Sequence, residues 1–143
     1  MLSAKELLHQ TITVLKHNPG QSIEQFAGCK SSPSHLPDCG NREIKSRRID
    51  AHTPTITLGG MTGTKEQTIE QVFNKIINVS FCVYRESIDK YSLTIVKTFE
   101  LESLNYDKFL NTSKYFEIRK GILYIKITPR KFINMYSGIQ VFE

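Results

Sequence analysis

The amino-acid sequence predicts an α+β fold with a mixed central β-sheet flanked by α-helices. Apolar residues recur at helical spacing near the N-terminus. The second half contains pairs of β-branched and aromatic segments separated by polar turns, which is typical of antiparallel strands. The chain has 143 residues, 39% of them hydrophobic and 10% aromatic, which suits a single domain over 1–143.

Two helices are expected at the N-terminus. Ser3 and Glu6 form a capping box, and the apolar spacing after it predicts a helix over about 4–17. The Asn-Pro-Gly sequence at 18–20 predicts the end of this helix. A second capping box opens a short helix over 22–27.

The next segment is read as loop and strand. Residues 30–37 are rich in Ser and Pro and predict a loop. Two extended pieces follow, 36–39 and 42–47, joined by a tight turn at Gly40-Asn41. Residues 55–58 alternate in polarity and predict a further strand.

The remaining elements follow from periodicity and turn residues. Thr64 caps a helix through about Ile77. Antiparallel strands are expected over 79–85 and 92–99. The expected elements after these are a short helix over 105–110, a hairpin of 115–119 with 122–127, a helix over 129–136 and an edge strand over 139–142.

Composition and charge narrow the function classes. The net charge of +5 favours a polyanionic partner only weakly. Three cysteines at irregular spacing argue against a disulfide framework, and Cys29, His35 and Cys39 form no regular zinc pattern. The N-terminus does not resemble a secretory signal, and no apolar run approaches the length of a membrane span. We therefore expect a cytoplasmic protein with no membrane partner.

One short segment carries the residues that phosphodiester hydrolysis needs. Mg²⁺ prefers carboxylate oxygens and lowers the pKa of an attacking water. Strand alternation places Glu43 and Lys45 on one face and directs Ile44 to the core. The Gly-Asn turn can fold Asp38 back beside Glu43, and the Ile44 backbone carbonyl is a further expected metal ligand.

A resemblance to a known family rests on these residues. Pro37-Asp38 followed by Glu43-Ile44-Lys45 resembles the PD-(D/E)xK signature of restriction-type nucleases. The wider string is similar to the MutH and MvaI/BcnI group of that superfamily; it consists of Gly20 to Glu24, Gly28, Pro37-Asp38 and Glu43 to Arg48, followed by the strand at 55–58. The resemblance covers roughly residues 20 to 60.

The resemblance implies Mg²⁺-dependent endonucleolytic cleavage of double-stranded DNA, of restriction or repair type. It implies that Asp38 and Glu43 bind the metal and that Lys45 positions water or phosphate. Glu24, on the short upstream helix, carries over as an acidic residue that reaches the metal site. The implied fold is a restriction-endonuclease-like mixed sheet flanked by helices.

Basic residues around this motif are candidate DNA contacts. They are Lys30, Arg42, Arg47 and Arg48, and each could instead belong to a solvated face. Two other kinds of site are disfavoured. Gly59-Gly60 lacks the Lys-Ser/Thr of a phosphate-binding loop, and Cys39 has no His partner at a known spacing.

Two alternatives remain open. Typical members of the resembled group are longer and use the extra residues to read bases. This favours a non-catalytic DNA-binding or assembly subunit on the same scaffold, or shifts base recognition to a partner subunit or a homodimer. A double-strand cut would need either a dimer or sequential nicks. The other alternative is a small α+β partner protein unrelated to nucleic acid.

Overall fold

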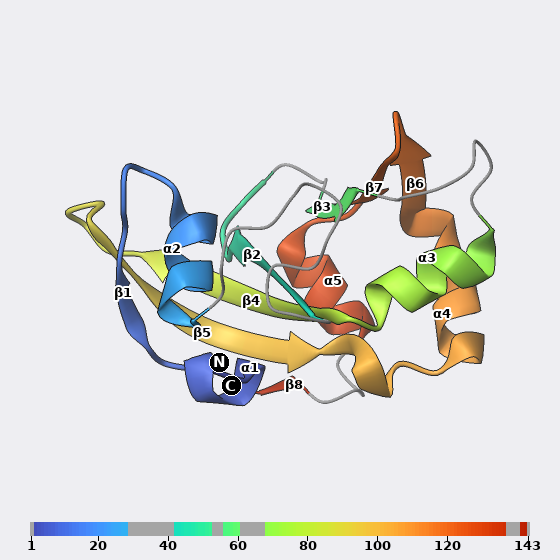
Figure 1. Cartoon of the computed structure of the whole chain (residues 1–143), viewed down its shortest axis with the longest axis horizontal. Coiled ribbons are helices and arrows are strands. Elements are labelled where there is room, and N and C mark those ends of the chain that lie inside the picture. Colours follow the sequence, from blue (N-terminus) through green and yellow to red (C-terminus); the bar gives the residue numbers. More distant parts are fainter. Residues whose placement is uncertain (1, 29–41, 53–55, 61–67, 137–140, 143) are drawn as a thin grey trace.

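The fold is α+β, with a mixed central sheet flanked by helices (Figure 1). The computed structural model describes residues 2–28, 42–52, 56–60, 68–136 and 141–142. The central sheet has the order β1 (Thr11–Thr13), β5 (Ser92–Glu100), β4 (Val79–Glu86) and β2 (Glu43–Arg48), and β8 (Val141–Phe142) also pairs with β5. The fold class expected from the sequence is therefore confirmed.

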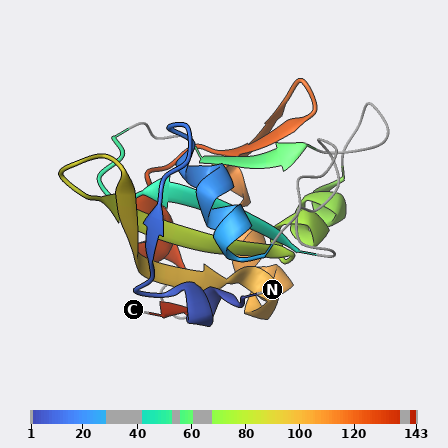
Figure 2. The same cartoon turned by 60° about the vertical axis from the view of Figure 1, so that its left-hand side comes forward.

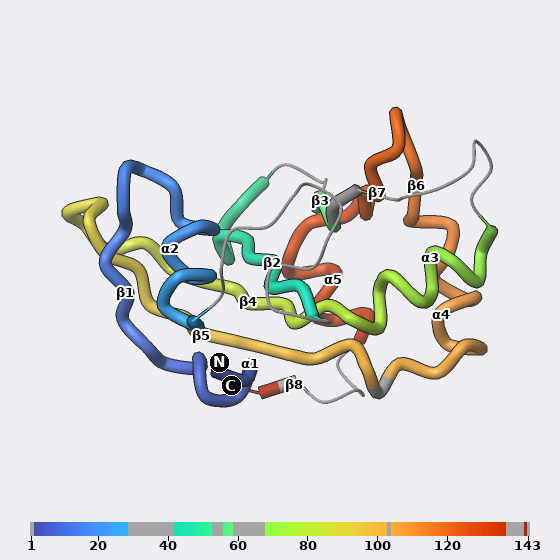
Figure 3. Tube along the Cα trace, in the orientation of Figure 1, coloured from blue at the N-terminus to red at the C-terminus, as the bar shows by residue number. Residues whose placement is uncertain are grey.

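The sheet is mixed because β2 runs parallel to β4, whereas β4 and β5 form the antiparallel pair expected from the sequence. A parallel neighbour requires a crossover connection. Figure 3 shows that the chain leaves β2, passes through β3 (Ile56–Gly60) and α3 (Ile69–Ile76), and returns along β4. This crossover brings the end of α3 to the start of β2.

A second, antiparallel sheet has the order β3, β7 (Ile122–Ile125) and β6 (Phe116–Arg119). The strands β6 and β7 are the predicted C-terminal hairpin, which is confirmed. Between β5 and β6 lie the short 3₁₀ helix η1 (Leu101–Ser103), the helix α4 (Tyr106–Thr112) and a second 3₁₀ helix, η2 (Ser113–Tyr115).

Helices cover both faces of the central sheet. The helix α2 (Pro19–Phe26) lies across one face, and α5 (Pro129–Met135) lies behind the sheet (Figure 2). The first face buries Ile23 against Ile44 and Cys82. The other face of the sheet packs into the main core, to which α3, α4, α5 and both sheets contribute side chains. No helix in the described ranges is long and apolar enough to cross a membrane.

The predicted helix over 4–17 is wrong beyond its first turn. The capping box of Ser3 and Glu6 is present, but α1 spans only Ala4–Leu7. His9 adopts a left-handed φ of 68°, and its N–H donates to the Ile95 carbonyl at 2.7 Å. The β-branched residues of β1 then pair with β5. Sheet pairing overrides the helical spacing here, because β-branched residues suit a strand.

The second helix begins earlier than its capping pattern indicated. Asn18 is the N-cap, and Pro19 occupies the first turn, where its missing N–H costs nothing. Ser22 is buried inside the helix, and its hydroxyl accepts from the Leu15 N–H at 2.8 Å. The Asn-Pro-Gly sequence that was expected to end a helix therefore starts one.

Later helices follow the expected cap chemistry. The N-cap of α3 is Thr68, which forms a capping box with Gln71, whereas the predicted cap at Thr64 lies outside the described residues. Asn105 caps α4, and Thr128 caps α5 with Pro129 in the first turn. The helices α4 and α5 match their predicted ranges closely, because short-range capping is encoded locally, whereas α3 begins at Ile69 rather than after Thr64.

We expect the free energy of unfolding to fall as pH rises above 9. Burial raises the pKa of the Cys82 thiol from 9.0 to about 12, so the thiol ionises in the unfolded chain first. The stabilising contribution of the neutral Cys82 thiol is present in full below pH 9. Between pH 9 and 12 the free energy of unfolding falls by up to about 1.4 kcal/mol per pH unit, because the unfolded chain releases this proton first. Urea melts at pH 8, 9 and 10 under reducing conditions measure this slope.

The matched control for this slope is Cys82→Ala. Between pH 9 and 10, other groups with raised pKa values, such as Tyr136 (raised to about 12 mainly by burial), contribute less than Cys82, because the pKa of a tyrosine in the unfolded chain is about 10.0. The variant should therefore show a flatter pH dependence in this window. An unchanged slope in Cys82→Ala would assign the effect to another group.

Candidate active site

The strand β2 presents two different faces. Ile44 is 4% exposed and packs with the residues beneath α2. Glu43 and Lys45 lie on the opposite face, because side chains alternate along a strand. Their partners in the neighbouring strand, Val79 and Phe81, belong to the main core. The strand thus holds an acid and a base side by side while Ile44 anchors it.

The backbone of β2 leaves the Ile44 carbonyl directed away from β4. The N–H of Glu43 donates to the backbone carbonyl of Asn78 at 3.0 Å, and the N–H of Ile49 donates to the backbone carbonyl of Tyr84 at 2.8 Å. Odd-numbered residues therefore point their backbone groups at β4, and even-numbered residues point away. The strand is the terminal one in the sheet order of the described residues, so this carbonyl faces the edge.

Glu43 is a buried carboxylate with a single described partner. Its Oε1 atom lies 2.6 Å from the Nζ atom of Lys75, in the last turn of α3. The side chains of Glu43 and Lys75 are only 6% and 15% exposed. Removing one member of such a pair typically costs about 3–5 kcal/mol, because the remaining charge stays buried.

The other carboxylate oxygen of Glu43 is different. Oε2 is buried and has no hydrogen-bond partner among the described residues. A buried, unpartnered polar atom is costly and calls for an explanation. A hard divalent cation prefers oxygen ligands of this kind, so the donor chemistry at Glu43 fits Mg²⁺.

Lys45 is half-buried, two residues along the same face. It makes no hydrogen bond or ion pair with the described part of the chain. Its ammonium group is therefore available to an external anion, as far as the described residues go. This contrasts with Lys75, whose ammonium group is held by Glu43.

The described part of the structure does not place the remaining predicted site residues beside Glu43. Asp38 and Lys30 lie outside the described residues, so their roles stay predictions. Glu24 lies on α2, which packs on the Ile44 face of β2, whereas Glu43 lies on the opposite face. Its predicted role at the metal site also stays a prediction. Within the described ranges, no group of three or more His, Cys, Asp or Glu side chains could hold a metal ion.

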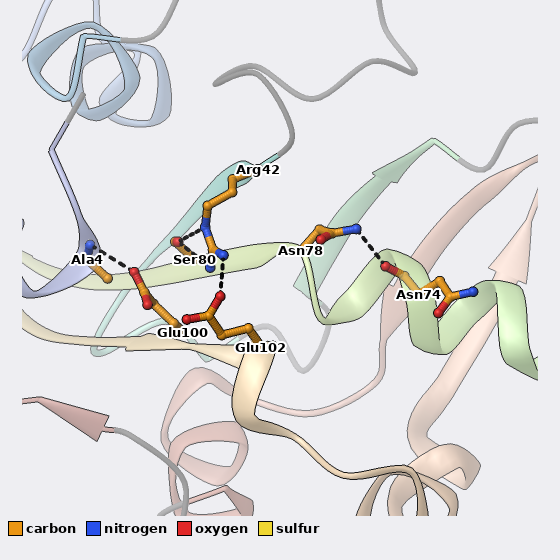
Figure 4. Close-up of polar contacts among 7 residues, drawn as sticks. All are labelled: Ala4, Arg42, Asn74, Asn78, Ser80, Glu100 and Glu102. Atoms are coloured by element: carbon orange, nitrogen blue, oxygen red, sulfur yellow. Dashed lines mark hydrogen bonds and ion pairs between the residues drawn. The ribbon is translucent and has the colours of Figure 1, made fainter.

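Two of the candidate DNA-contacting arginines, Arg42 and Arg48, have polar partners within the described part of the chain. Arg42 donates to the Ser80 hydroxyl at 3.1 and 3.3 Å and contacts Glu102 at 3.0 Å (Figure 4). Arg48 contacts Asp50 at 2.8 Å and Glu86 at 3.6 Å. Both guanidinium groups are thus partly neutralised by acids of the chain itself.

Arg47 lies on the same face of β2 as Glu43 and Lys45. It borders a pocket of about 290 Å³ whose lining is mostly polar: Ser46, Arg47, Arg48, Ala51, His52 and Tyr84. Burial, followed by the nearby Glu86, raises the pKa of Tyr84, so the phenol is neutral at pH 7 and can donate a hydrogen bond. Such a lining suits an anion.

Sequence reasoning did not identify Lys75. It lies 32 residues after Glu43, in a helix whose amphipathic pattern indicates only a packed face. The one local signal is its place in the last turn of a helix, where cations are favoured by the helix dipole. That signal does not indicate which carboxylate it meets.

Comparisons of the chain with family models, with curated proteins and with solved structures find no match. Any function proposed for this protein therefore rests on its own residues and their geometry.

Proposed function

We propose that this protein is a Mg²⁺-dependent endonuclease that hydrolyses phosphodiester bonds of double-stranded DNA. The observation that carries the proposal is the face of β2 on which buried Glu43, with one unpartnered carboxylate oxygen, stands two residues from Lys45. The motif resemblance and the net charge of +5 are consistent with it.

Each residue has a defined part in this proposal. Glu43, Asp38 and the Ile44 carbonyl would hold Mg²⁺, which supplies charge neutralisation at a phosphate when bound. Lys45 would place its ammonium against the phosphate or the attacking water and stabilise developing negative charge. Ile44 keeps the strand in register through its packing in the core.

The direct test is incubation of the pure protein with supercoiled plasmid and Mg²⁺, with EDTA in a parallel reaction. We expect nicked or linear DNA only where Mg²⁺ is free. Glu43→Gln, which keeps the side-chain shape, should lose this activity. Cleavage that persists in EDTA or in the variant would contradict the proposal.

A second candidate is a non-catalytic DNA-binding or assembly subunit on the same scaffold. The observation that favours it is the 2.6 Å ion pair of Glu43 with Lys75, which gives the carboxylate a structural partner. Salt-dependent DNA binding without nicking in Mg²⁺ would support this candidate. The absence of salt-dependent DNA affinity would contradict both candidates.

We expect Arg47→Gln to weaken DNA binding equally across sequences and to lower the slope of log K against log salt by about 0.9. Arg47 lies about 13 Å from Glu43 along the strand, within reach of a neighbouring backbone phosphate. Binding isotherms at several salt concentrations, without Mg²⁺, measure the slope.

The control for Arg47 is Arg42→Gln. Because the charge of Arg42 is paired with Glu102 at 3.0 Å, its removal should release fewer counter-ions and change the slope by less than about 0.9. Equal slopes for Arg47→Gln and the wild type would show that Arg47 makes no phosphate contact.

A further inference from the structure

We infer that Lys75 is a built-in counter-ion which competes with the divalent cation for Glu43 and so weakens metal binding. This inference rests on the proposed metal-binding role of Glu43. It assigns Lys75 as a positioning residue, because it acts through Glu43. A cation at Glu43 would therefore have to compete with the ammonium group of Lys75 for the carboxylate.

The geometry leads to this inference in three steps. The Nζ atom of Lys75 lies 2.6 Å from Oε1 of Glu43. A divalent cation bound to this carboxylate would compete with the ammonium group for the same oxygen. The second oxygen, Oε2, is buried and has no hydrogen-bond partner among the described residues, so the pair leaves half of the carboxylate unsatisfied. Two cations cannot share one buried carboxylate oxygen without strong repulsion.

The placement of Lys75 also argues against a purely structural tie. Its helix, α3, is held to the core independently by Val72 and Ile76, which are buried. The cap of α3 is secured at its other end by Thr68 and Gln71. The helix therefore has other anchors, and the long, unbranched side chain of Lys75 can withdraw while the backbone stays in place.

The test measures cation affinity without DNA, using Mn²⁺ and Mg²⁺ alone in calorimetric titrations and thermal melts. Lys75→Met keeps an unbranched side chain that is one atom shorter and removes the charge. We expect this variant to bind Mn²⁺ at least about tenfold more tightly than the wild type, since the cation then meets an unneutralised buried carboxylate. Its melting temperature should also rise more on adding Mn²⁺.

Three further variants keep the test decisive. Lys90→Met removes a charge beyond the opposite end of β4 and should match the wild type. Lys75→Arg keeps the charge and should restore weak binding. The double variant Glu43→Gln with Lys75→Met has no buried charge left at this position, so it should fold without cation and lose the tight binding. If Lys75→Met fails to fold even in Mn²⁺ while this double variant folds, the cation cannot replace the ammonium and the inference is overturned.

The outcomes separate the inference from the proposed function. If Glu43→Gln weakens Mn²⁺ binding but Lys75→Met leaves it unchanged or weaker, Lys75 is not a competitor and only the inference fails. If neither Glu43→Gln nor Lys75→Met changes Mn²⁺ binding, Glu43 is not a ligand and the proposed function fails with it.

Discussion

Lys45→Ala should reduce plasmid cleavage in Mg²⁺ by about 100–1,000-fold, to the limit of detection in a simple gel assay. The ammonium group of Lys45 has no described partner and stands on the face of Glu43, so its expected role is to stabilise charge on the reacting phosphate. Loss of a group that acts mainly in the transition state lowers the rate far more than it lowers affinity.

The control measurements for Lys45 separate chemistry from binding and folding. DNA affinity measured without Mg²⁺ should fall only a few-fold, by about one phosphate contact. The melting temperature should change little, because Lys45 makes no ion pair in the described part of the chain. Lys90→Ala, beyond the far end of β4, should cut normally. A Lys45→Ala protein that cleaves at the wild-type rate would remove the active-site assignment.

Phe132→Ala should destabilise the protein by about 3–5 kcal/mol, the largest stability effect that we expect from truncating a core side chain. Phe132 is fully buried on α5. Its ring lies 5.1 Å from the Phe81 ring, 5.4 Å from Phe99 and 5.1 Å from Tyr136, so it joins α5 to both central strands. Truncation removes these contacts and leaves a cavity.

Urea denaturation measures this loss, and two variants calibrate it. Phe132→Leu keeps most of the volume and should cost clearly less. Phe26→Ala truncates a phenylalanine that is 41% exposed at the end of α2 and should cost little. A Phe132→Ala protein as stable as Phe26→Ala would mean that α5 does not close the main core.

The strands and caps could be predicted from the sequence because their signals are local. The hairpins formed by β4 with β5 and by β6 with β7 follow from β-branched and aromatic segments around polar turns. The alternation that places Glu43 and Lys45 opposite Ile44 follows from strand geometry alone. These features need only neighbouring residues.

The N-terminal segment shows where local signals fail. Residues 11–13 fit a helical period, but they form β1 because β5 offers an edge with free backbone groups. That edge is made by residues 79 to 83 positions later, as the Thr11–Thr94 contact illustrates. The sequence pattern cannot report it, since the competing pairing partner is not local.

The sequence by itself determined the α+β class, most of the strands and the alternating face of β2, because periodicity and capping act over a few residues. Only the tertiary structure decided which groups meet that face. The Lys75 ammonium reaches Glu43 across 32 positions, and Glu102 reaches Arg42 across 60. Ion pairs of this kind depend on how a crossover returns the chain to the sheet, and residue spacing does not encode that path.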